Sequence, residues 1–197
     1  MSDFFKTVKG ISQGLYKEKM SKFISFAEPV QSADEAKAVV KKYQNQYHDA
    51  RHVCWAYMIG TDRSEYLSSD NGEPSGTAGK PILGQINSFG LTNIVIVVVR
   101  YFGGIKLGTS GLIVAYREAA AEAIKAGEIL ECHEQATISF TFAYLGMNDV
   151  MKVIKSEDLR IISQNFDNCC TMTVQLDADK AEPLKKRLTD LGGVSIS

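Results

Sequence analysis

The chain has 197 residues, enough for one large domain or two small ones. Hydrophobic residues make up 45% and charged residues 23%, which are ordinary values for globular proteins and exclude a disordered or fibrous class. The formal net charge of −1 excludes a polybasic protein that holds nucleic acid by overall charge, so any RNA contact has to be local.

The first predicted elements are a strand, a helix and a second strand. Residues 22–30 (KFISFAEPV) favour a strand, and Ser32 with Glu35 forms a capping box that opens a helix. Apolar residues then recur at helical spacing as far as Tyr47, which predicts a helix packed on a sheet. Residues 53–60 (VCWAYMIG) predict the second strand, followed by a turn-rich loop.

Residues 94–99 (IVIVVV) are apolar without alternation, which predicts a central strand buried on both faces. After it, we expect a helix over residues 111–126 with Thr109 or Ser110 as its cap and Gly127 as its end. The apolar run at residues 94–99 is far shorter than the ~20 residues that span a bilayer, so we expect no membrane insertion.

A second pattern begins near residues 131–134. Strand and helix signals then follow in the order βαββαβ, which is the order of a split-βαβ, ferredoxin-like unit. We therefore expect an α+β protein with one domain at 1–132 and a ferredoxin-like domain at 133–197. The four cysteines show no CxxC pairing, which favours a reducing compartment and places the protein in the cytoplasm.

The strongest local signal is a cluster of glycines. Nine of the sixteen glycines fall between residues 72 and 111. Glycine-rich loops bring backbone N–H groups together into an anion-holding nest, and here a buried strand leads through Arg100 and Lys106 into a helix N-terminus. This predicts a phosphate-sized anion site. Alternatively, the glycines only form tight turns and let a helix lie close to the sheet.

Other polar groups offer weaker catalytic hypotheses. Asp70 and Glu73 flank a turn, and paired carboxylates can share acid–base work or hold Mg²⁺, although both also belong to turn-forming strings. His52 and Cys54 are placed on one face of a strand, as a base and a thiol nucleophile would be, or simply as packing groups. No nucleotide-binding glycine motif or zinc-ligand spacing is present, so we expect no catalytic set, no metal and no cofactor.

The glycine-rich block also carries a resemblance. The strings DNGEPSGTAGKPIL at 70–83 and VVVRYFGGIKLG at 97–108 resemble the signature of the IMPACT family, bacterial YigZ type. The resemblance implies a first domain with the fold of the second domain of the fifth small-subunit ribosomal protein and of elongation factor G domain IV. It also implies a ferredoxin-like second domain, and relatives in eukaryotes that regulate translation initiation. A nucleic-acid-binding or ribosome-binding role is implied for the bacterial type by fold.

We therefore expect a non-enzymatic cytoplasmic protein, a translation-related regulator, whose partner is RNA, the ribosome or a translation factor. The alternative is an enzyme acting on a phosphorylated small molecule in the same pocket. The expected anion-binding or nucleic-acid-binding residues are Arg51, His52, Asp70, Gly72, Glu73, Ser75, Gly76, Thr77, Gly79, Lys80, Arg100, Tyr101, Phe102, Gly103, Gly104, Lys106, Gly108, Thr109, Ser110 and Gly111.

Overall fold

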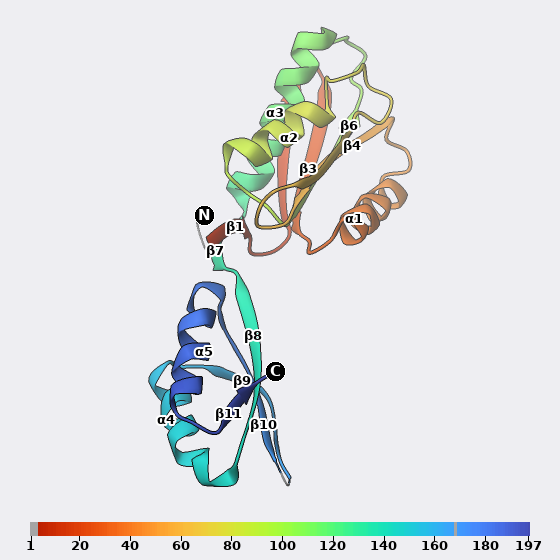
Figure 1. The fold of residues 1–197 in the computed structure, drawn as a ribbon. Coiled ribbons are helices and arrows are strands. Elements are labelled where there is room, and N and C mark those ends of the chain that lie inside the picture. Colours follow the sequence, from red (N-terminus) through yellow and green to blue (C-terminus); the bar gives the residue numbers. More distant parts are fainter. Residues whose placement is uncertain (1–3, 168) are drawn as a thin grey trace. The chain divides into compact units, whose positions relative to one another are not determined.

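The computed structural model describes residues 4–167 and 169–197. Their contacts divide the chain between Cys132 and His133 into a first unit, Phe4–Cys132, and a second unit that runs to Ser197 (Figure 1). The mixed α+β class expected from the sequence is confirmed. Each unit is described by itself.

The first unit is built on a five-stranded antiparallel sheet with β6 at its centre. The order across the sheet is β2-β3-β6-β4-β5. The strands are β2 (Ser12–Glu18), β3 (Ser21–Pro29), β4 (His52–Ile59), β5 (Glu65–Ser69) and β6 (Ile94–Tyr101). The predicted central strand is confirmed, because every residue of β6 except Tyr101 is buried.

Helices cover both faces of this sheet. Helix α1 (Ala33–Gln46) lies on one face, and α2 (Gly79–Ser88) and α3 (Gly108–Ala126) lie on the other (Figure 1). Alternate residues of β6 enter the two cores: Ile96 packs beneath α2 and α3, whereas Val97 packs beneath α1. A strand that is apolar on both sides loses the alternating pattern, which explains its sequence.

The helix boundaries differ in part from those expected. The Ser32 cap of α1 is confirmed, since its side chain accepts a hydrogen bond from the Glu35 N–H. Helix α3 begins three residues earlier than predicted, so Thr109 and Ser110 lie inside its first turn and cap nothing. The cap position belongs to Leu107, which is buried. The chain therefore turns into the helix at the core and not at the surface hydroxyls.

Gly14 on β2 lets α3 lie directly against the sheet. A Cβ at this position would come 2.5 Å from the amide nitrogen of Ala123 and 2.6 Å from Ser25 Oγ. We predict that Gly14→Ala lowers the free energy of unfolding by about 2 kcal/mol, because helix and strand would have to move apart. Urea denaturation checks this, with Gly10→Ala as the control, since a Cβ there meets nothing within 4 Å. Equal losses in both variants would contradict the close packing.

A two-stranded ribbon joins the two ends of the first unit. Strand β1 (Phe4–Val8) pairs with β7 (Ile129–His133). The backbone N–H of Lys9 donates to the carbonyl of Glu128 at 2.9 Å, and the Lys9 side chain forms an ion pair with the same residue at 2.8 Å.

The second unit has the expected element order βαββαβ. Its strands form an antiparallel sheet in the order β11-β8-β10-β9, and α4 and α5 pack on it through one apolar core (Figure 1). The elements are β8 (Gln135–Phe142), α4 (Met147–Ser156), β9 (Arg160–Phe166), β10 (Cys170–Asp177), α5 (Ala181–Asp190) and β11 (Val194–Ile196), with short 3₁₀ turns at Tyr144–Gly146 and Ala178–Lys180.

Candidate anion-binding site

The sheet register places three site residues in one row. Arg100 of β6 lies between Phe23 of β3 and His52 of β4. Directly paired residues of an antiparallel sheet share a face, so their side chains stand next to one another on the face covered by α2 and α3. Arg100 therefore reaches the site from the central, fully packed strand of the unit.

Arg100 is held by a buried carboxylate. Its Nη1 lies 2.6 Å from Glu73 Oε1, and the two side chains are only 7% and 3% exposed. The hydroxyl of Tyr116, on α3, donates to the same carboxylate oxygen at 2.7 Å. His52 Nε2 lies 3.9 Å from the other oxygen of Glu73. The Glu73 carboxylate thus joins the loop before α2 to β6 and α3.

Asp70 organises the loop that carries Glu73. Its carboxylate accepts hydrogen bonds from the N–H groups of Gly76, Ala78 and Gly79 at 2.8, 3.0 and 2.8 Å. Burial opposes ionisation, but these three bonds hold the pKa of Asp70 below its usual value. Because Asp70 itself is the anion at the start of α2, those amides are not free for a ligand. The N–H groups of Gly76 and Gly79 therefore already have partners within the protein.

The His52 and Cys54 side chains both contact this loop. His52 Nδ1 lies 2.9 Å from the carbonyl of Asn71, and the Cys54 thiol donates to the carbonyl of Asp70 at 2.9 Å. Burial raises the pKa of the Cys54 thiol to about 12. A thiol with this pKa stays protonated at neutral pH, so Cys54 has no nucleophilic thiolate to offer.

The segment between β6 and α3 is fixed by close packing. Gly103 lies on the turn between β2 and β3, where a Cβ would overlap the backbone of Met20. Its N–H donates to Ser21 Oγ at 3.3 Å. Gly104 follows with a φ of +89°, in the left-handed region that glycine adopts without strain. This sets Phe102 and Lys106 on either side of a rigid bend.

These elements enclose a cavity of about 480 Å³. It brings together residues from β4, the loop after Asp70, β6 and the start of α3, and nine of the residues predicted from sequence line it. They are Arg51, His52, Gly72, Glu73, Arg100, Phe102, Lys106, Gly108 and Thr109, accompanied by Pro74, Leu107 and Leu112. The two halves of the glycine-rich block therefore meet at one pocket.

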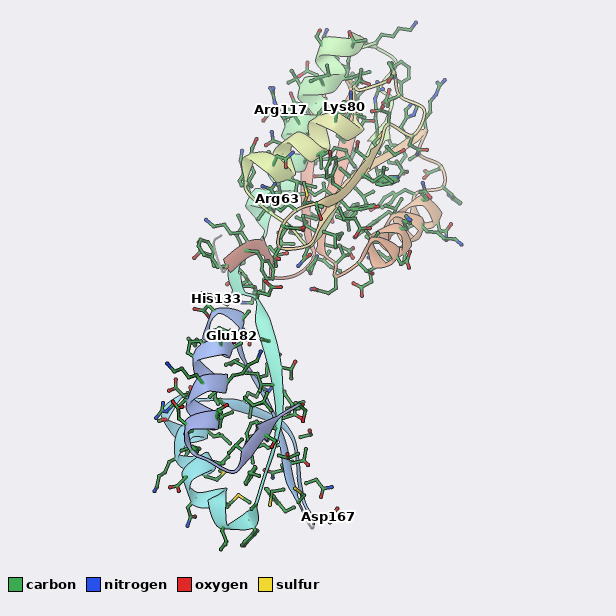
Figure 2. All side chains as sticks on the ribbon, in the orientation of Figure 1. Arg63, Lys80, Arg117, His133, Asp167 and Glu182 are labelled. Atoms are coloured by element: carbon green, nitrogen blue, oxygen red, sulfur yellow. The ribbon has the colours of Figure 1, made fainter. Side chains whose placement is uncertain are left out.

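The remaining predicted residues lie elsewhere. Thr77 is buried and donates to the carbonyl of Pro74 at 2.6 Å, and the Tyr101 hydroxyl donates to Asp49 at 2.8 Å. Lys80 is exposed at the start of α2 (Figure 2). Ser110 and Gly111 line a separate cavity of about 250 Å³. Gly79 is the first residue of α2, and Asp70, Ser75, Gly76, Gly103 and Gly104 belong to the loops around the pocket; none of these residues is part of its lining.

The positive charge of the pocket is partly neutralised. Glu73 offsets the charge of Arg100, so Arg51 and Lys106, both exposed, supply the unpaired charge among its lining residues. Within the described part of the chain, Arg100 Nε is one of three buried side-chain nitrogen or oxygen atoms without a hydrogen-bond partner. A buried N–H without a partner is costly, and because this atom has almost no exposed surface the structure gives a ligand no direct access to it.

Comparison with known proteins gives the family. A family model described as the Impact N-terminal domain matches residues 19–124, which include every residue of the pocket. The chain belongs to the IMPACT family. The IMPACT family member YigZ of Escherichia coli is 34% identical over 182 residues, covering 90% of this chain and 88% of the relative. An IMPACT family member of Haemophilus influenzae is 33% identical over 174 residues, covering 87% and 84%.

A solved structure described as a hypothetical protein superposes on this IMPACT family chain with a TM-score of 0.75 and 29% identity, covering 100% of this chain and 97% of that one. The resemblance found in the glycine-rich strings is therefore confirmed. In the part of this IMPACT family chain that the structure describes, no helix combines the length and apolar character needed to cross a membrane.

Proposed function

We propose that the pocket binds RNA phosphate and that the protein is a non-enzymatic, translation-related regulator acting on RNA, the ribosome or a translation factor. The observation that supports this most is the convergence of Arg51, Lys106 and the first turn of α3 on one cavity that Arg100 also lines. Helix N-termini and unpaired cations favour phosphate oxygens.

The family supports the choice of partner. The resemblance to the IMPACT family implies eukaryotic relatives that regulate translation initiation, and we infer an elongation factor G domain IV-like fold for the first unit and a ferredoxin-like fold for the second. The resemblance links the first of these folds to a ribosomal protein and to elongation factor G, which act in translation. We assign the protein to the cytoplasm because ribosomes lie there, and the four free cysteines fit a reducing compartment.

We predict that removing the two exposed cations of the pocket weakens RNA binding. For each RNA phosphate that a cation no longer neutralises, the slope of log affinity against log salt concentration for a single strand becomes shallower by about 0.7. The Arg51→Gln, Lys106→Gln double variant loses two such cations and should bind roughly 10- to 30-fold more weakly near 0.1 M salt. Fluorescence anisotropy with labelled RNA, using the whole chain over a range of salt, measures both quantities.

A matched control exists on the opposite face of the sheet. Lys37 and Lys41 are exposed on α1, and Lys37→Gln, Lys41→Gln changes the net charge by the same amount. We expect this control to bind as the unaltered protein does. Absence of binding at low salt, or equal losses in both double variants, would exclude the pocket as an RNA phosphate site.

The cavity volume also favours a second candidate, an enzyme acting on a phosphorylated small molecule. About 480 Å³ lies within the range of roughly 300–1,000 Å³ found for small-ligand sites. A ligand at one hundred times its Kd adds about 2.7 kcal/mol of stability, so a thermal-shift screen of phosphorylated metabolites with and without Mg²⁺ separates this candidate from RNA binding.

A further inference from the structure

Phe102 is an aromatic ring at the mouth of the pocket that the fold does not bury. It is 46% exposed, although it follows the fully buried strand segment that ends at Arg100. It lines the cavity together with Lys106 and Gly108. An exposed aromatic side chain next to cations is the combination by which proteins bind single-stranded nucleic acid.

The ring is held by contacts on its protein side. The guanidinium carbon of Arg100 lies 5.6 Å from the ring centroid of Phe102 and 5.6 Å from that of Phe23. Phe23 is completely buried. Arg100 therefore lies against one buried and one exposed ring, and its position is fixed by Glu73. Cation–π attraction of this kind steadies Phe102 without covering it.

The backbone on either side of Phe102 is also fixed. Tyr101 before it is tied to Asp49 through its hydroxyl at 2.8 Å, and Gly103 after it packs on Met20. A ring presented by a fixed backbone loses little conformational entropy when a flat group stacks on it. The site is thus organised before any ligand arrives.

We infer that the pocket takes one unpaired nucleotide of a single-stranded RNA, with its base stacked on Phe102 and its phosphate against Arg51, Lys106 and the start of α3. This rests on the proposed function and adds the conformation of the RNA that is recognised. In a duplex the bases are stacked on one another and their faces are closed to the protein, whereas unpaired bases offer theirs. Double-stranded RNA therefore reaches the cations but not the ring.

The test compares three probes at low salt by fluorescence anisotropy: a single-stranded RNA, the matching RNA duplex, and an abasic strand of the same length and charge. The variant is Phe102→Leu, which keeps an apolar side chain on the loop, and Phe102→Trp restores an aromatic face. Tyr66→Leu is the control, because Tyr66 is an aromatic residue of the same unit that is 58% exposed on β5. Thermal denaturation confirms that each variant folds.

We expect Phe102→Leu to weaken binding of the single strand by roughly 5- to 150-fold, the range for losing one stacked base, while duplex and abasic binding stay unchanged. Phe102→Trp should restore the affinity, and Tyr66→Leu should have no effect. If the affinities of all three probes depend on Lys106 but change by the same factor in Phe102→Leu, the stacking inference is overturned and the phosphate site stands. If no probe binds at low salt, both fall.

Discussion

Glu73→Ala is expected to be the most destabilising single substitution near the pocket, lowering the free energy of unfolding by about 3–5 kcal/mol. That is the range observed when one partner of a buried ion pair is removed, because the other charge stays buried without compensation. Here the remaining charge is Arg100, whose side chain is 7% exposed. Urea denaturation of the purified protein measures the loss.

Two further variants separate charge from packing. Tyr116→Phe removes one hydrogen bond to Glu73 and leaves the ion pair, so it should cost only about 1 kcal/mol. Adding Arg100→Met to Glu73→Ala removes the uncompensated charge and should recover part of the lost stability. If Arg100→Met lowers the stability of the Glu73→Ala variant by as much as it lowers that of the unaltered protein, the uncompensated buried charge is not the cause of the loss.

Asp70→Ala is expected to cost about 3 kcal/mol. The carboxylate satisfies three backbone N–H groups, one in the loop before α2 and two at the start of that helix. Each buried donor left unpaired costs about 1–3 kcal/mol, reduced here because water can enter the partly exposed loop. Asp70→Asn retains an acceptor oxygen and should lose less. Equal losses for the two variants would contradict a role as acceptor.

The same carboxylate makes stability depend on pH in the acid range. Because the pKa of Asp70 is lower in the folded protein than its unfolded value of about 3.9, ionised Asp70 stabilises the fold fully above that value. The contribution is lost as the pH falls through the folded-state pKa. Denaturation curves between pH 7 and pH 2 should therefore converge for the unaltered protein and Asp70→Asn as the acid end is approached.

The sequence located the pocket because the signal was local. Glycines and cations in two short strings predicted loops that come together, and the buried character of residues 94–99 indicated the strand that supports one of them. The partners across the sheet were not predictable in the same way. The pairing of Glu73 with Arg100 depends on the register between β4 and β6 and on the conformation of the loop that Asp70 fixes. Residue spacing in the sequence encodes neither the register nor the loop conformation.

Two other features were missed for identifiable reasons. Helix α2 begins with glycine and has Pro81 in its first turn, so its sequence resembles a loop, and its start depends on the carboxylate of Asp70 in the preceding loop. The second feature is Tyr116, which lies among alanines on the buried face of α3. A tyrosine buried in an alanine-rich helix needs a partner for its hydroxyl, and this signal pointed to a polar group beneath α3.

The β1–β7 ribbon affects the order in which the first unit can form during its own synthesis. Strand β1 is made at the start of the unit, but its partner β7 is the last strand of that unit to be made. At about 5–20 residues per second, roughly 6–25 s pass between the two. Until then the edge of β1 that β7 covers stays open, so the ribbon can close only after the rest of the unit has left the ribosome.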